Sequence, residues 1–457
     1  ENYNFAKPFS NFLPGIAGPW GIPMWVFYVN RGQGIISCGT EDKEHSIMEF
    51  YPANKAYQLC STHGFRTFIK IKKGKGYIFY EPFQVNNFNS CYDTKQEIFV
   101  SSAQLRIVET SLKLGLRITV EYFTVPNASF AGLARKLTIE NLGRGKKELE
   151  IIDGIPAIVP YGTGEWCLKE MSRTIEAWMQ VENLDKNAPF YRLRVDSADR
   201  PEVVYIEKGN FYINYSIKSG KPNINPVIVD PDVIFNGILD FCEPKNFFVN
   251  KPFVIPAWQM KCSKTPSAFS FARLKLGARS KDSIYTILGK ADSLVSLNSL
   301  LPEITKQNYL EDKQKENKEI IEGIQNNVFL SSAKEELNLY TKQTYLDNVL
   351  RGGLPLALGA KDNPLIFHVY SRKHGDLERD YNNFLVSASY LSQGNGSYRD
   401  ICQNRRLDVW YNTLVKDSVL IEFFNLIQAD GYNPLVIKED VFCVDKLTVA
   451  DLKEFIR

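Results

Sequence analysis

The stretch that decides the fold is Leu116-Arg117-Ile118-Thr119-Val120-Glu121-Tyr122, in which apolar and polar residues alternate without a break. This period of two puts one set of side chains on a core and the other in water, as in a half-buried strand. The same alternation recurs in Phe65–Lys70 and Leu105–Val108. Many such runs, separated by turn residues, are typical of antiparallel sheets packed face to face. We therefore predict a β-sandwich domain over residues 1–290.

The pattern changes after residue 290, where helical stretches replace the alternating runs. Residues 291–330 include a highly charged segment, Glu303–Asn327, which we interpret as a solvated helical linker. Residues 331–457 are dominated by helical patterns, among them Ser332–Leu350, followed by the helix-ending pair Gly352-Gly353, and Leu377–Tyr390. The sequence thus predicts a multidomain α+β protein: a sandwich, a linker and a helical domain.

Composition excludes several classes of function. The 457 residues carry a net charge of only +3 without a basic cluster, which argues against a nucleic-acid partner. No apolar run is long enough for a membrane span, and no signal peptide opens the chain. The eight cysteines form no Cys-x-x-Cys and meet no histidine at ligand spacing. We predict scattered reduced thiols in a cytoplasmic protein that has neither a disulfide framework nor a metal site.

The chemistry is concentrated in Gln393–Arg406, which reads Gln-Gly-Asn-Gly-Ser-Tyr-Arg-Asp-Ile-Cys-Gln-Asn-Arg-Arg. Two glycines precede an Arg-Asp pair and a run of amide and guanidinium groups. Such planar donors and acceptors suit the recognition of a sugar, which presents many hydroxyls. The aromatic share of 13% fits carbohydrate sites, but it fits β-sheets better.

Three segments resemble one group of enzymes: Gly21–Gly34 (Gly-Ile-Pro-Met-Trp-Val-Phe-Tyr-Val-Asn-Arg-Gly-Gln-Gly), His374–Asn382 (His-Gly-Asp-Leu-Glu-Arg-Asp-Tyr-Asn) and Gly396–Asp400. The chain resembles the N-terminal part of the inverting β-glucan phosphorylases of the cellobiose phosphorylase group, glycoside hydrolase family 94 with relatives 149 and 161. The resemblance implies a β-sandwich, a helical linker and the beginning of an (α/α)6 barrel, incomplete in this chain. It also implies a homodimer. Within the segment Arg31-Gly32-Gln33-Gly34, we expect a tight turn rather than a phosphate loop.

The resemblance also implies the reaction and part of its site. Phosphate, as co-substrate, attacks a terminal glucose of a β-1,3- or β-1,2-glucan and releases α-glucose 1-phosphate with inversion; no cofactor is needed. Arg399 and Asp400 correspond to the pair that grips hydroxyls of this glucose, and Gln403 to the Gln of the same motif. The sequence departs from the family at Cys402, where Asn is usual, and at Gly394, where the cellobiose enzymes carry Arg.

The family's general acid and phosphate site would lie beyond Arg457, so we assign no catalytic residue in this chain and expect it to be inactive alone. Asp376 and Asp380 fit a capped, salt-bridged helix start better than a proton donor. Two other readings stay open: a related (α/α)6-barrel glycoside hydrolase, and a non-catalytic carbohydrate-binding or interaction protein. His368 and His374 lack a metal partner at ligand spacing, and we expect no ligand role for them.

Overall fold

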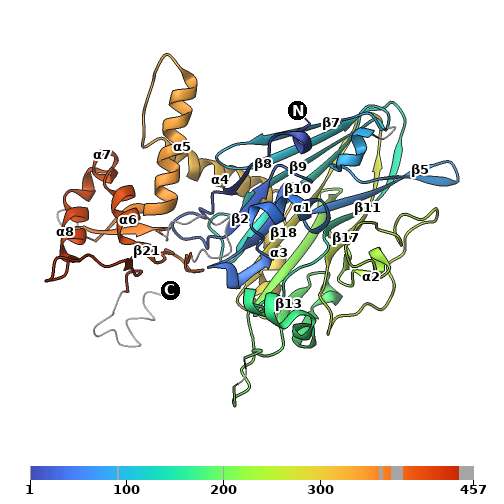
Figure 1. Cartoon of the computed structure of the whole chain (residues 1–457). Coiled ribbons are helices and arrows are strands. Elements are labelled where there is room, and N and C mark those ends of the chain that lie inside the picture. The colour runs from blue at the N-terminus through green and yellow to red at the C-terminus, as the bar shows by residue number, and fades with distance from the viewer. Residues whose placement is uncertain (1, 90–91, 199, 360–363, 372–383, 442–457) are drawn as a thin grey trace.

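The computed structural model describes residues 2–89, 92–198, 200–359, 364–371 and 384–441. Two large antiparallel sheets form the body of the molecule and helices gather at its C-terminal end, so the predicted α+β class with an N-terminal sandwich is confirmed. Figure 1 shows the sheets on one side, helices α6 to α8 on the other, and helix α5 (Glu335–Gly352) projecting between them.

The larger sheet has nine strands, in the order β12-β13-β14-β18-β10-β9-β8-β7, with β15 added to β14. Its strands are β7 (Thr94–Val100), β8 (Leu105–Ser111), β9 (Leu116–Thr124), β10 (Ala131–Asn141), β12 (Met179–Glu182), β13 (Phe190–Leu193), β14 (Gly209–Lys218), β15 (Lys221–Ile224) and β18 (Lys281–Ala291). The stretch that opened the sequence analysis is β9. Its apolar side chains Leu116, Ile118, Val120 and Tyr122 are all fully buried.

The second sheet has five strands in the order β16-β17-β11-β5-β6, and a third has four in the order β1-β2-β3-β4. Their strands are β5 (Arg66–Lys73), β6 (Gly76–Tyr80), β11 (Lys147–Ile155), β16 (Val227–Ile228) and β17 (Ala268–Leu276), then β1 (Ser10–Leu13), β2 (Trp25–Val29), β3 (Ile35–Gly39) and β4 (Ser46–Met48). The main core lies between the nine- and five-stranded sheets, where Leu133 and Leu137 of β10 share one apolar cluster with Ile69 of β5 and Ile151 of β11.

Helices cover the outer faces and lead into the C-terminal part. They are α1 (Ala53–His63), α2 (Asp232–Phe235), α3 (Leu294–Ile304) and α4 (Tyr309–Gln325). A capping box of Ser293 and Ser296 begins α3, which packs Leu297 and Leu301 on the outer face of the nine-stranded sheet. The linker helix α4 is less solvated than expected: it buries Leu310 and Ile321. One face of this charged segment is therefore apolar enough to dock on its neighbours.

The C-terminal part mixes helices with short strands. It contains α5, β19 (Leu354–Leu358), β20 (Leu365–Val369), β21 (Gly396–Ser397), α6 (Tyr398–Arg405), α7 (Asp408–Tyr411), α8 (Ser418–Asn425) and β22 (Val436–Ile437). Helix α5 ends at the predicted glycine pair, where Gly353 takes a φ of 95°. The helix expected at Leu377–Tyr390 is wrong in its described part: residues 384–390 are not helical, because Val386 pairs with Glu41 of the sandwich instead.

Candidate functional site

Helix α6 carries all three sugar-binding residues that the sequence predicted. Its buried side is formed by Ile401 and Arg405, four residues apart. Arg399 and Gln403 are exposed and share another side of the helix, also four residues apart, with Asp400 at its edge. The structure therefore brings Arg399, Asp400 and Gln403 together on the solvent-facing side of one helical turn.

Arg399 and Asp400 form a local ion pair. The Nε and Nη2 atoms of Arg399 both lie 3.0 Å from Oδ1 of Asp400. The side chain of Arg399 is 86% exposed and that of Asp400 only 16%, so the pair lies at the rim of the fold. An exposed pair of this kind contributes little to stability. Oδ2 of Asp400 has no hydrogen-bond partner among the described residues, so this oxygen can accept from a ligand hydroxyl.

Gly394 and Cys402 are the two positions at which the sequence departs from the motif that it resembles. A Cβ placed on Gly394 would overlap the carbonyl oxygen of Leu385, so no side chain fits at this position. The arginine of the cellobiose enzymes therefore has no room here. Cys402 lines an apolar groove together with Tyr398 and Phe423.

A network of charged side chains lies on the buried side of α6. Arg405, only 4% exposed, binds both carboxylate oxygens of Glu422 through Nη1, at 2.8 and 3.0 Å. Nearby, Nε2 of His368 lies 3.0 Å from Oδ2 of Asp408. Arg405, Glu422 and His368 line one wall of a pocket of about 460 Å³, and Asp440 completes the wall. This volume is within the range of small-ligand pockets.

Burial sets the protonation of the His368–Asp408 pair. Desolvation disfavours both charged forms, so it raises the pKa of Asp408 to about 7, and Arg405 and Glu422 modify this shift in opposite directions. Desolvation and the charge of Arg405 hold the pKa of His368 well below its usual range. His368 is therefore neutral near pH 7, while Asp408 is protonated below about pH 7 and ionises above it.

The raised pKa of Asp408 predicts how stability depends on pH. Its folded pKa lies above the unfolded value, so the free energy of unfolding falls as pH rises from about 4 to about 7. Asp408→Asn removes this dependence, and its amide can still donate to His368. As pH rises across this range, we expect the melting temperature of the variant to rise relative to that of the wild type. If the difference in melting temperature between the variant and the wild type is the same at every pH, the assignment is wrong.

The family-like segment Gly21–Gly34 has a structural role. Gly34 N donates to Arg31 O at 2.9 Å, and Gly32 has a φ of 50°, which confirms the predicted tight turn. Gln33 is buried, and Oε1 accepts from Arg135 Nη2 at 2.6 Å inside the sandwich. This segment therefore contributes to the buried core of the sandwich.

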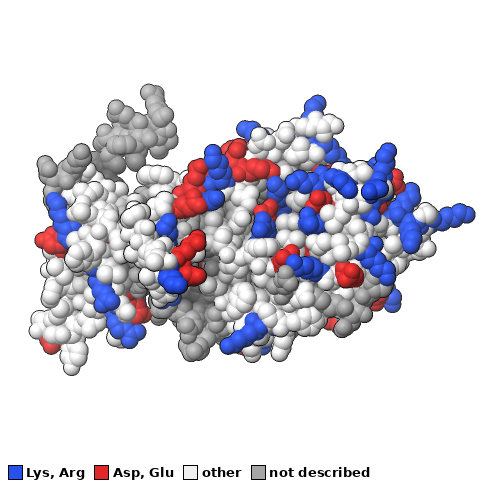
Figure 2. Space-filling model, turned by 90° about the horizontal axis from the view of Figure 1, so that it is seen from above, with Lys and Arg blue, Asp and Glu red and all other residues white. Residues whose placement is uncertain are grey.

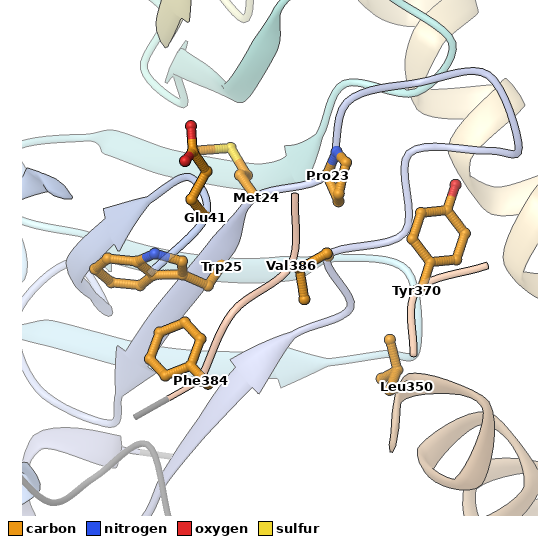
Figure 3. Close-up of a pocket in the computed structure, with 9 residues that line it drawn as sticks. Pro23, Met24, Trp25, Glu41, Leu350, Tyr370, Phe384 and Val386 are labelled. Atoms are coloured by element: carbon orange, nitrogen blue, oxygen red, sulfur yellow. The ribbon is translucent and has the colours of Figure 1, made fainter. Parts of the chain in front are cut away.

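The same segment also meets the C-terminal part. Trp25 and Phe384 pack edge to face, with ring centroids 6.0 Å apart, at one end of a small pocket, and Tyr370 and Leu350 lie at the other end (Figure 3). The pocket measures about 20 Å³, room for a single water. This junction is a packed contact between the two parts of the chain rather than a ligand site.

Sequence reasoning missed the residues behind α6. His368 stands in an apolar strand, where a lone histidine is more often structural, and Arg405 and Glu422 are too far apart in sequence to suggest a pair. The segment His374–Asn382, which includes Asp376 and Asp380, lies outside the described residues. Within the described ranges, no group of three His, Cys, Asp or Glu side chains is placed to hold a metal ion.

The surface adds two general findings. None of the described helices combines the length and apolarity that a membrane span requires. Figure 2 shows basic and acidic side chains interspersed over this face of the sandwich and few charges over the helical end. The one face in view thus presents no large patch of a single charge.

Comparison with known proteins gives only distant likenesses. No family model matches the sequence, and no curated protein matches it. A bacterial glucoamylase complexed with acarbose is similar at 12% identity with a TM-score of 0.40, covering 94% of this chain and 55% of that structure. A protein described as a kojibiose phosphorylase from the human microbiome is similar at 8% identity with a TM-score of 0.26. The likeness covers 77% of this chain and 32% of that protein's chain. A family GH92 α-mannosidase from Bacteroides thetaiotaomicron also has 8% identity and a TM-score of 0.26. That likeness covers 77% of this chain and 40% of the mannosidase chain.

The chain thus spans about half the length of the glucoamylase and about a third of the phosphorylase. These TM-scores lie below 0.5, so the likenesses establish neither a reaction nor a substrate for this chain.

Proposed function

We propose that this chain belongs to a glycoside phosphorylase that cleaves β-1,3- or β-1,2-glucan oligosaccharides with inorganic phosphate. The observation that supports the proposal is the Arg399–Asp400 pair on α6, which the family resemblance singles out and whose arginine is exposed to solvent. On this proposal, the helices from α5 onward are the beginning of an (α/α)6 barrel.

In the proposed reaction, phosphate attacks the anomeric carbon of the terminal glucose with inversion, and the glycosidic C–O bond breaks. The departing oxygen takes a proton from a general acid, which gives α-glucose 1-phosphate and the shortened glucan. An inverting hydrolase needs a second carboxylate to activate water, whereas here the phosphate is itself the nucleophile. The reaction therefore needs one carboxyl group as general acid but no general base, and Asp400 is assigned neither role. Its carboxylate accepts from glucose hydroxyls while Arg399 donates to them, and both bonds are charge-assisted.

An assay on the complete gene product tests the proposal. We expect laminari- or sophoro-oligosaccharides to yield glucose 1-phosphate in the presence of phosphate, and only background signal when phosphate is omitted. Release of free glucose without phosphate would instead identify a hydrolase. No product from any β-glucan under either condition would overturn the proposed function.

A further inference from the structure

The residue that fixes the orientation of α6 lies on the side of the helix away from the Arg399–Asp400 pair. At about 100° per residue, Arg405 lies about 140° around the helix from Asp400 and about 120° from Arg399. The pair is thus at the rim while Arg405 is buried at 4% exposure. A short helix with only two buried residues, Ile401 and Arg405, depends on them for its placement.

Arg405 connects α6 to three other elements. Its Nε donates to the carbonyl of Gly352 at the end of α5, at 2.8 Å. Its Nη2 donates to Oγ of Ser371, just after β20, at 3.0 Å, and its Nη1 binds the Glu422 carboxylate of α8. A single guanidinium therefore fixes α6 against α5, the β20 end and α8 at the same time.

The groups that Arg405 contacts are themselves tied to the neighbouring chain. Ser371 O accepts from Gly394 N at 2.7 Å, in the turn that leads into α6. A Cβ on Gly352 would lie 2.9 Å from Cβ of Asn404, so the end of α5 and α6 are in direct contact. Ile401 and Tyr398, which packs on Phe423, also hold α6, but Arg405 ties the helix to α5, Ser371 and α8 at once, so a change at Arg405 should shift it.

We propose that Arg405 is a positioning residue for the Arg399–Asp400 pair: it touches no substrate and acts by fixing the helix that presents the pair. This inference rests on the proposed function. Only the guanidinium fork can reach all three partners, since the lysine ammonium is a single point of contact. Arg405→Lys should therefore keep the ion pair with Glu422 and lose the other tethers.

A double-mutant cycle separates positioning from a merely structural role. In the complete gene product, we expect Arg405→Met to lower kcat/KM for oligoglucan phosphorolysis about tenfold or more, with Arg405→Lys in between. In an Asp400→Asn background the same change should cost less than about threefold, because residues that act through one another are not additive. Arg406→Met is the matched control, since this neighbouring guanidinium is exposed and has no partner among the described residues; about wild-type kcat/KM is expected.

Two further measurements keep the test decisive. Ser371→Ala, which removes one tether only, replaces Arg405→Met if that variant fails to fold by circular dichroism. Calorimetric titration with laminaribiose or sophorose, without phosphate, reports binding independently of turnover. Equal losses in both backgrounds, or a folded Arg405→Met with wild-type kcat/KM, would overturn the inference. A wild type that neither binds nor cleaves any glucan would instead refute the proposed function.

Discussion

In the complete gene product, Asp400→Asn is expected to lower kcat/KM for β-glucan phosphorolysis by about a hundredfold or more. Asn has nearly the same shape, but it cannot offer two anionic oxygens to vicinal hydroxyls, and it loses the ion pair with Arg399. Hydrogen bonds to a charged group contribute about 1.5–3 kcal/mol each, and 1.4 kcal/mol is a factor of ten in rate. Initial rates of glucose 1-phosphate release at several glucan concentrations measure the effect.

The structure offers a matched control for this change. Asp417 is an exposed carboxylate that precedes α8 and makes no side-chain capping bond, so Asp417→Asn changes the same group outside the proposed site. We expect its kcat/KM to stay within about twofold of the wild type. Both variants should melt close to the wild type, because the Arg399–Asp400 pair is at the surface. Wild-type activity in Asp400→Asn would refute the role given to this residue.

Local sequence patterns predicted the sandwich because the information is local there. The alternation in Leu116–Tyr122 decides which side of β9 faces the core, and the structure buries that side completely. The end of a helix also depends on nearby residues, and the glycine pair at 352–353 ends α5 as expected. Such features depend on neighbours in the chain, so one sequence is enough to predict them.

The C-terminal part was harder to predict because its contacts are distant in sequence. Val386 N donates to Glu41 O, a pairing that no helical pattern can reveal, and it takes the place of the expected helix. The strands β19 and β20 are short apolar runs, for which the pattern cannot distinguish strand from helix. Tertiary pairing decided the structure at both places.

The candidate site also contains some residues that are close in sequence and others that are distant. Arg399, Asp400 and Gln403 come from one continuous motif, so the sequence predicts that they lie close together, although it did not predict the helix α6 that carries them. Arg405 meets Glu422 across 17 positions and Gly352 across 53, and His368 meets Asp408 across 40. Only the folded chain brings these groups together, and the residues that hold a site in place are for this reason harder to predict than those that face its ligand.

The largest loss of stability is expected inside the sandwich, at the ion pair of Arg135 and Asp153. Arg135 on β10 and Asp153 on β11 join the two sheets, and they are 0% and 1% exposed. Arg135 Nε donates to Tyr122 OH at 3.2 Å, and Thr67 Oγ1 donates to Asp153 Oδ1 at 2.7 Å. Each charge thus has a charged partner and further hydrogen bonds, which is what makes its burial tolerable.

Removing one partner leaves the other charge buried without compensation, so Asp153→Leu should destabilise the fold by about 3–5 kcal/mol. The double variant Arg135→Met, Asp153→Leu removes both charges and should lose less than the single one, because no unpaired charge remains. Urea unfolding followed by tryptophan fluorescence measures both, with Glu148→Gln as a control at the exposed Lys72–Glu148 pair, where no measurable change is expected. A double variant that is less stable than Asp153→Leu would show that the pair itself, and not the avoidance of an unpaired charge, holds the two sheets together.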